Sequence, residues 1–243
     1  MKAYVIHYSK GTQRREALEN DPRFKILTDV TWITWYDREE PECEWTRSLC
    51  RSTAPKNIIS NTLKFCEALR LFVESDQDEC LIFEDDVVFQ GAWMEKLQKA
   101  LTDYPQIEIL RLDCVTHIKY DGEIKIVSDW WPCEALYMKK EFAKFILRQV
   151  SFNQVFDNFL YSLMTNFGIQ MVLLPLCNQT SLIEVDRVHL TMNDEILYYN
   201  YDDLKAKLLE LKTKKMVIDQ KFLEKYGRKV DIRSITYLEE NDL

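Results

Sequence analysis

The chain has 243 residues, of which 47% are hydrophobic and 30% are charged. This length and composition suit one α/β domain with a helical appendage. The formal net charge is −8 and no lysine- or arginine-rich stripe stands out, so we expect no nucleic acid among the partners. Seven scattered cysteines without a CxxC pair indicate reduced thiols. The first apolar run is too short for a signal peptide or membrane span, which predicts a cytoplasmic protein with no transmembrane anchor.

Apolar runs rich in β-favouring residues predict seven strands. They cover residues 3–8, 32–37, 80–83, 107–113, 124–127, 134–138 and 169–175. Apolar residues recur at every third or fourth position over 57–75 and again over 153–167, and both segments are predicted to be helices. Strands that alternate with helices predict an α/β fold with a mixed, mostly parallel central sheet flanked by helices.

The residue pattern of the sequence changes near residue 200, which predicts a domain boundary. Beyond it Leu204, Leu208, Leu211 and Met216 indicate an amphipathic helix that ends by Gly227. We therefore assign 1–200 to the α/β domain and 201–243 to a C-terminal helical extension. The extension is expected to pack on the domain or on a partner subunit, the second arrangement giving a homodimer.

Three consecutive carboxylates, Glu84, Asp85 and Asp86, follow the apolar run 80–83. A run without alternation is typical of an interior parallel strand, and ligands gather at the carboxyl ends of such strands. Alternation along an extended chain predicts that Glu84 and Asp86 face one way while Asp85 turns back. Converging carboxylates suit Mg²⁺ or Mn²⁺, which bridge protein oxygens to a substrate diphosphate. A simple polar turn after the strand is the alternative interpretation.

The segment "LIFEDDVVF" (81–89) resembles the metal-binding segment of glycosyltransferase family 25, a variant of the DxD motif of GT-A fold transferases. Other segments of this family, in the same order, are similar to "AYVIHYSKGTQRREAL", "NIISNTLKFCEALRLFVE", "DWWPCEALYMKKEFAKFIL", "FDNFLYSLM" and "LLPLCNQTS". The sequence departs from the family where His7 replaces an asparagine, where Ser60-Asn61 replaces a Ser-His pair, and where 131–134 replaces a glycine-rich stretch. The resemblance implies a GT-A (Rossmann-like) fold.

The resemblance also implies an activity, the transfer of a hexose (galactose or glucose) from a UDP-sugar to a hydroxyl of a glycan or protein acceptor, with inversion. Mn²⁺ or Mg²⁺ is the implied cofactor. Asp86 is the implied direct ligand, and Glu84 or Asp85 is expected to contact the metal or the ribose. His189, in "VDRVHLT", is the best-placed histidine for a further ligand; an ordinary surface histidine is the alternative.

Residues that bind the nucleotide are expected near strand ends and helix starts. Arg14 and Arg15 follow Thr12 in the first strand–helix loop, where guanidinium groups and a helix N-terminus bind phosphate. Further candidates for the base, ribose or phosphates are His7, Asp37, Asn57, Asn61, Glu84 and Asp85. An ordinary solvated helix start and a buried helix cap are the alternatives for the arginines and asparagines.

The catalytic base should be a carboxylate near the acceptor. Asp157 occupies the position of the family's helix aspartate, and Glu134, after two tryptophans, is the reserve candidate. Two other functions stay open: a catalytically degenerate protein that binds nucleotide sugars, and a metal-dependent phosphoesterase. The aspartate nucleophile pattern of haloacid-dehalogenase phosphatases is not matched, because Glu84 and Val88 stand at its defining positions.

Overall fold

A computed structural model describes residues 1–113, 123–127, 135–179 and 198–226, with only the backbone for 179 and 217–226. The chain divides into two compact units, residues 1–202 and 203–243. The Glu134 and His189 candidates lie outside the described residues. Across the described ranges, no helix has both the length and the apolar character needed to cross a membrane.

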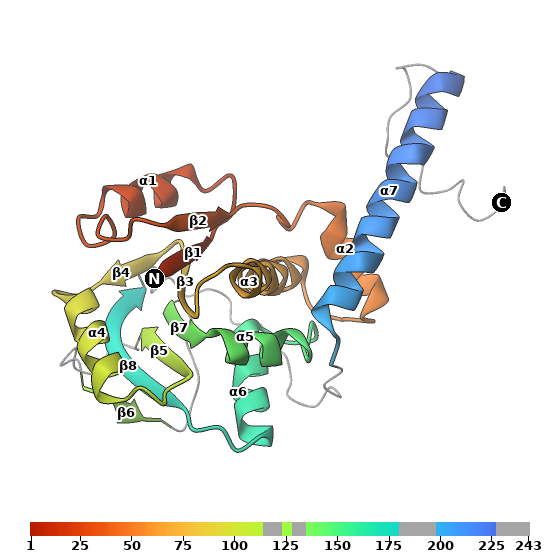
Figure 1. The fold of residues 1–243 in the computed structure, drawn as a ribbon. Coiled ribbons are helices and arrows are strands. Elements are labelled where there is room, and N and C mark those ends of the chain that lie inside the picture. Colours follow the sequence, from red (N-terminus) through yellow and green to blue (C-terminus); the bar gives the residue numbers. More distant parts are fainter. Residues whose placement is uncertain (114–122, 128–134, 180–197, 227–243) are drawn as a thin grey trace. The chain divides into compact units, whose positions relative to one another are not determined.

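Strands and helices alternate through the first unit (Figure 1). In chain order the elements are β1 (Lys2–Ile6), α1 (Thr12–Asn20), β2 (Val30–Ile33), α2 (Pro41–Leu49), α3 (Lys56–Glu74), β3 (Glu79–Glu84), β4 (Val87–Phe89), α4 (Trp93–Asp103), β5 (Ile109–Asp113), β6 (Lys125–Ile126), β7 (Ala135–Lys139), α5 (Lys140–Leu147), α6 (Phe156–Asn166), β8 (Val172–Gln179) and α7 (Tyr201–Tyr226). The two helices predicted from apolar periodicity correspond to α3 and α6.

The strands of the described chain form one sheet in the order β2-β1-β3-β7-β5-β8-β4, with β6 paired to β8. β1 is parallel to β2 and β3, and β5 is parallel to β8. β7 lies antiparallel between β3 and β5, while β4 and β6 are antiparallel to β8. Five of these eight strands therefore run in one direction. The predicted α/β class with a mixed, mostly parallel sheet flanked by helices is confirmed.

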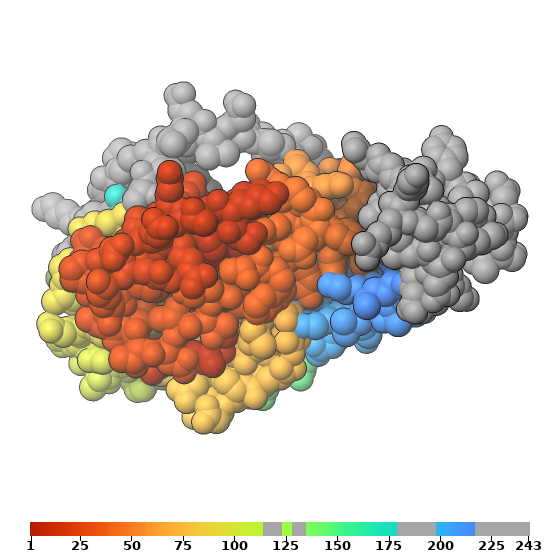
Figure 2. All heavy atoms as spheres, turned by 90° about the horizontal axis from the view of Figure 1, so that it is seen from above, coloured from red at the N-terminus to blue at the C-terminus, as the bar shows by residue number. Residues whose placement is uncertain are grey.

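Helices cover the sheet on both faces. Buried side chains of α1 and α4, such as Leu18 and Trp93, join one hydrophobic core with alternate strand residues such as Val5 and Phe83. Helix α3 contacts β1 and β3 and also packs against α5 and α6. In Figure 1, α4 and α3 stand on opposite sides of the sheet, and Figure 2 shows the surface that the N-terminal elements, coloured red and orange, form when seen from above. The five cysteines in the described ranges are buried, and none of them forms a disulfide bond.

The second predicted strand ends four residues earlier in the structure than expected. The run 32–37 was expected to be extended, but β2 ends at Ile33. Tyr36 adopts a φ of 68°, a left-handed conformation that is costly for a residue with a side chain. Its carbonyl oxygen accepts hydrogen bonds from Ser60 Oγ at 2.5 Å and from Cys43 Sγ at 3.5 Å. These bonds turn the chain away from the sheet, which places Asp37 in a loop instead of at a strand end.

Helices α3 and α6 are joined by the stacked rings of Phe65 and Phe156, whose centroids lie 4.1 Å apart. Both side chains are buried. We expect Phe156→Ala to lower the free energy of unfolding by about 3–5 kcal/mol, because it removes a buried ring and leaves a cavity. Denaturant titration followed by circular dichroism measures this change. Phe167→Ala is the matched control, since Phe167 is 53% exposed and should cost less than about 1 kcal/mol. Equal costs for the two variants would contradict the packing described.

Candidate functional site

A polar cavity of about 170 Å³ lies where β1 and β3 end. The parallel register pairs Ile6 with Glu84, so the two strands stop at the same level and His7 lies beside Asp85. Side chains converge on this cavity from β1, α1, the loop after β2, α3 and β3. They are Ile6, His7, Tyr8, Arg14, Arg38, Asn57, Ser60, Asn61, Lys64, Glu84 and Asp85. The carboxyl edge of a parallel sheet is the usual place for a ligand in such folds.

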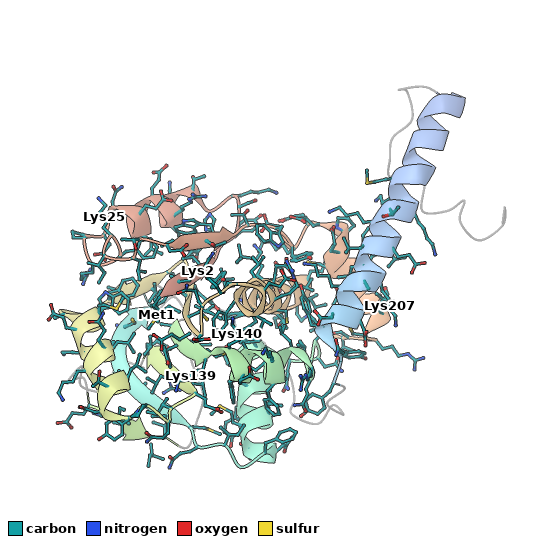
Figure 3. The ribbon with its side chains drawn as sticks, viewed as in Figure 1. Met1, Lys2, Lys25, Lys139, Lys140 and Lys207 are labelled. Carbon is teal, nitrogen blue, oxygen red and sulfur yellow. The ribbon has the colours of Figure 1, made fainter. Side chains whose placement is uncertain are left out.

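A larger cavity, of about 480 Å³, lies at the opposite edge of the sheet and is lined partly by Met1, Glu79 and Met94. Figure 3 shows Met1 and Lys2, where β1 begins, near Lys139 and Lys140, where the antiparallel β7 ends. The carboxylate of Glu79 already accepts a hydrogen bond from the hydroxyl of Tyr137 at 2.8 Å. By volume alone, this larger cavity would be the candidate ligand site. We place the site at the smaller one because five elements direct charged and amide groups into it.

The three acidic residues Glu84–Asp86 are here called the carboxylate turn, and two of them, Asp85 and Asp86, contact a shared cation. β3 ends at Glu84, and Asp85 and Asp86 form a tight turn before β4. Arg14 Nη1 lies 3.1 Å from Asp85 Oδ1 and 3.7 Å from Asp86 Oδ2. His7 Nδ1 lies 2.7 Å from Asp85 Oδ2. Both oxygens of the buried Asp85 carboxylate therefore have partners on the N-terminal strand and helix.

The carboxylate turn differs from the predicted alternation. Glu84 and Asp86 were expected to share a side, with Asp85 turned back. Instead Glu84 and Asp85 line the cavity together, and Asp85 and Asp86 share Arg14. Alternation holds for an extended strand, and the strand stops at Glu84. The side chain of Glu84 accepts a hydrogen bond from Asn61 Nδ2 at 3.0 Å, which ties the turn to α3.

Arg14 is accessible from the cavity, because its side chain is 54% exposed although it contacts two buried carboxylates. Partial burial disfavours its charge, but the hydrogen bond to Asp85 and the charges of the carboxylate turn outweigh that effect. Together they raise the pKa of Arg14 above its ordinary value. The guanidinium is therefore a permanent positive charge at the cavity.

Helix α3 presents a stripe of polar residues to the cavity, here called the polar stripe: Asn57, Ser60, Asn61 and Lys64. Their spacing of three, four and seven residues puts them on one helix face. Asn57 and Asn61 were predicted from the sequence to contact the nucleotide. Lys64 was not predicted, although it continues the same spacing.

Lys64 and Asp37 form an ion pair with side chains only 3% and 6% exposed. Lys64 Nζ also donates to the backbone carbonyl of His7 at 2.6 Å. Asp37 accepts hydrogen bonds from the backbone N–H of Ser9, at 3.2 Å, and from the Ser9 hydroxyl. Asp37 was predicted to reach the base or ribose. In the structure its carboxylate instead joins the loop after β2 to the loop after β1 and to α3.

The predicted phosphate-binding residues of the first loop and helix divide between two cavities. Thr12 and Arg15 line a third cavity, of about 270 Å³, together with His7 and Ser9. Arg15 hydrogen-bonds Glu19 at 2.8 Å and stacks over Trp32 with its Cζ 4.6 Å from the ring centroid. Neighbouring residues on a helix point about 100° apart, which is why Arg14 and Arg15 line different cavities.

Two further residues of the polar cavity at the ends of β1 and β3, Tyr8 and Arg38, were not predicted. The Tyr8 hydroxyl donates to Glu39 at 2.8 Å, and the guanidinium of Arg38 lies 4.9 Å from the Tyr8 ring centroid. Tyr8 is the last residue of the predicted strand 3–8, and this position at a strand end was the available signal. Arg38 lies beyond the unexpected bend at Tyr36, and no local pattern marks it.

Asp157, the predicted base, lies in the first turn of α6 and is partly exposed. It is not among the described residues that line the polar cavity. Its neighbour Phe156 stacks on α3, so Asp157 lies on an element that packs directly against the helix bearing the polar stripe.

Asp85 and Asp86 are the residues of the carboxylate turn whose oxygens could hold a divalent cation together. Within the described ranges, no three His, Cys, Asp or Glu side chains are grouped as a protein-built metal site. Mg²⁺, however, commonly uses one or two carboxylates plus substrate phosphates. Arg14 Nη1, between Asp85 and Asp86, marks a point where two carboxylates already converge on positive charge. The oxygen donors suit Mg²⁺ or Mn²⁺.

No protein-family model and no curated protein matches this sequence. Among solved structures, the A197 protein from STIV is similar over 73% of this chain and 83% of its own, at 11% identity and a TM-score of 0.45. The inositol-1-phosphate CTP transferase from T. maritima is similar over 73% of this chain and 88% of its own, at 9% identity and a TM-score of 0.40. Likenesses this distant assign no function.

We expect Lys64→Met to lower the free energy of unfolding by about 3–5 kcal/mol, because it leaves the carboxylate of Asp37 buried without its cation. The double variant with Asp37→Asn should cost less than the sum of the two single changes. Urea denaturation of all three variants measures this coupling. Lys99→Met is the control, since the ion pair of Lys99 with Asp103 is exposed and its loss should leave the midpoint unchanged. Additive effects at Lys64 and Asp37 would refute the pairing.

Proposed function

We propose that the chain is a glycosyltransferase that moves a hexose from a UDP-sugar to a hydroxyl of a glycan or protein acceptor, with inversion. One observation carries the proposal: the carboxylate turn and Arg14 meet at a polar cavity on the carboxyl edge of β1 and β3. The segments that resemble glycosyltransferase family 25 supply the parts of this cavity, "AYVIHYSKGTQRREAL" contributing His7 and Arg14 and "LIFEDDVVF" contributing Glu84 and Asp85.

Transfer of a sugar requires stabilisation of the departing diphosphate. Arg14 is exposed and permanently charged, and a guanidinium binds phosphate oxygens through paired N–H donors. A bound Mn²⁺ or Mg²⁺ would add Lewis-acid stabilisation of the same charge. In this proposal Asp85 and Asp86 would hold that cation, and Glu84 and His189 are proposed as further ligands.

The polar stripe of α3 is proposed to hold the nucleoside. Ser60 is already engaged with the carbonyl of Tyr36, and Asn61 with Glu84. Asn57 is exposed one helical turn nearer the start of α3. These groups fix the wall of the cavity and leave amide and hydroxyl dipoles facing it, which suits recognition of a base and ribose by hydrogen bonds.

The second half of the reaction needs a base that removes the acceptor's proton. Asp157 is the proposed base and Glu134 the reserve. A carboxylate on α6 would take the hydroxyl proton while the acceptor oxygen attacks the anomeric carbon from the side opposite the diphosphate, which gives inversion.

Thermal unfolding with UDP-galactose, UDP-glucose and GDP-sugars, each with and without Mn²⁺, tests this function. A ligand at a hundredfold excess over its Kd stabilises by about 2.7 kcal/mol, which raises the Tm of a domain this size by roughly 5–10 °C. We expect a UDP-sugar with Mn²⁺ to give such a shift. Asp86→Asn should remove the Mn²⁺-dependent part, and Asp103→Asn, on the exposed side of α4, should not.

Each outcome of that panel has a distinct meaning. Absence of stabilisation by every nucleotide would rule out the proposed transferase. Stabilisation without consumption of the donor, with or without an acceptor, would identify a protein that binds nucleotide sugars only. Release of phosphate from simple phosphoesters, lost in Asp86→Asn, would identify a phosphoesterase instead.

A further inference from the structure

Two cations of the site pair with carboxylates, and they differ in exposure. Lys64 is 3% exposed and binds Asp37 and the backbone of His7. Arg14 is 54% exposed, while its partners Asp85 and Asp86 are 7% and 4% exposed at their side chains. Moving the Lys64 ammonium would leave the buried carboxylate of Asp37 without its counter-charge. The Arg14 guanidinium can instead leave its carboxylates for solvent or for an anion, because most of its side chain is already exposed.

Arg14 contacts the carboxylate oxygens that a divalent cation would need. Its Nη1 lies 3.1 Å from Asp85 Oδ1 and 3.7 Å from Asp86 Oδ2, and the other oxygen of Asp85 is held by His7. A cation placed between the two carboxylates would occupy the same point as this nitrogen. It would also repel the guanidinium, because two positive charges a few ångströms apart interact strongly near a protein surface. Arg14 and the cation therefore compete for Asp85 and Asp86.

We infer that Arg14 is an exchangeable counter-ion: it neutralises Asp85 and Asp86 in the ligand-free protein and transfers to the donor diphosphate when a divalent cation replaces it. This inference rests on the proposed function. The metal alone must displace Arg14, which gains no new partner. The metal together with a diphosphate gives the displaced guanidinium two phosphate groups to bind. Metal and nucleotide should consequently bind with positive coupling, and the coupling must be reciprocal.

The test measures binding of Mn²⁺ alone, UDP alone and UDP with saturating Mn²⁺, by calorimetry and by the electron paramagnetic resonance signal of free Mn²⁺. Arg14→Gln should bind Mn²⁺ alone about tenfold more tightly or better, because it removes a charge-assisted competitor. The same variant should bind UDP with Mn²⁺ about tenfold more weakly, because the phosphates lose a cationic partner. Opposite signs for the two ligands are the signature of an exchangeable counter-ion.

Two further variants separate this effect from a change in net charge. Arg14→Lys keeps the positive charge without the planar guanidinium, so its affinity for Mn²⁺ alone should lie between wild type and Arg14→Gln. Arg47→Gln removes an exposed arginine from α2 and should bind Mn²⁺ and UDP as wild type does. Circular dichroism of each variant confirms that α1 and the sheet are intact.

If Arg14→Gln binds Mn²⁺ alone no more tightly than wild type, or does not bind it at millimolar concentration, the counter-ion role is overturned. A result in which Mn²⁺ and UDP affinities fall together in this variant also overturns it. If wild type binds no nucleotide with or without Mn²⁺, the proposed function fails. The comparison with Mn²⁺ alone then still decides whether Arg14 competes for Asp85 and Asp86, because it involves no nucleotide.

Discussion

The geometry of the cavity depends on one buried ion pair. Lys64 of α3 joins Asp37, in the loop after β2, to the carbonyl of His7, at the end of β1. Two further contacts join the same elements: Ser60 of α3 donates to the carbonyl of Tyr36, and the backbone N–H of Ser9 donates to Asp37. Burial makes the pair costly to break from either side, so the loops after β1 and β2 are held in the positions that shape the cavity wall.

The second ion cluster also pairs a basic side chain with carboxylates, but its cation is exposed. Arg14, Asp85 and Asp86 join α1 to the turn after β3, but the cation is more than half exposed. An exposed guanidinium is in contact with solvent before and after it moves. A buried ammonium can move only by leaving a buried carboxylate without its counter-charge. His7 belongs to both clusters, through its carbonyl to Lys64 and through its ring to Asp85. The buried Lys64–Asp37 pair thereby positions His7, whose ring contacts Asp85 in the cluster that contains Arg14.

Local patterns in the sequence predict where the site lies better than how its side chains are arranged. The apolar run before Glu84 predicts the strand and its carboxylates at the sheet edge. Which way each carboxylate points depends on the turn at Asp85, and alternation cannot predict a turn. Lys64 continues the spacing of Asn57 and Asn61, but a helical lysine usually lies in solvent. Its partner is 27 residues away in the sequence, so only the fold reveals the pair. The antiparallel direction of β7 is equally invisible in its apolar pattern.

Helix α3 connects the two halves of the proposed reaction. One face carries the polar stripe, and Phe65, next to Lys64, stacks on Phe156 of α6. Asp157 follows Phe156 directly, so its position relative to the cavity is set by packing between two helices. Close-packed rings move little when a surface ligand binds. A base on α6 should therefore occupy the same place before and after the nucleotide enters, and the rearrangement that we propose for binding is the movement of Arg14.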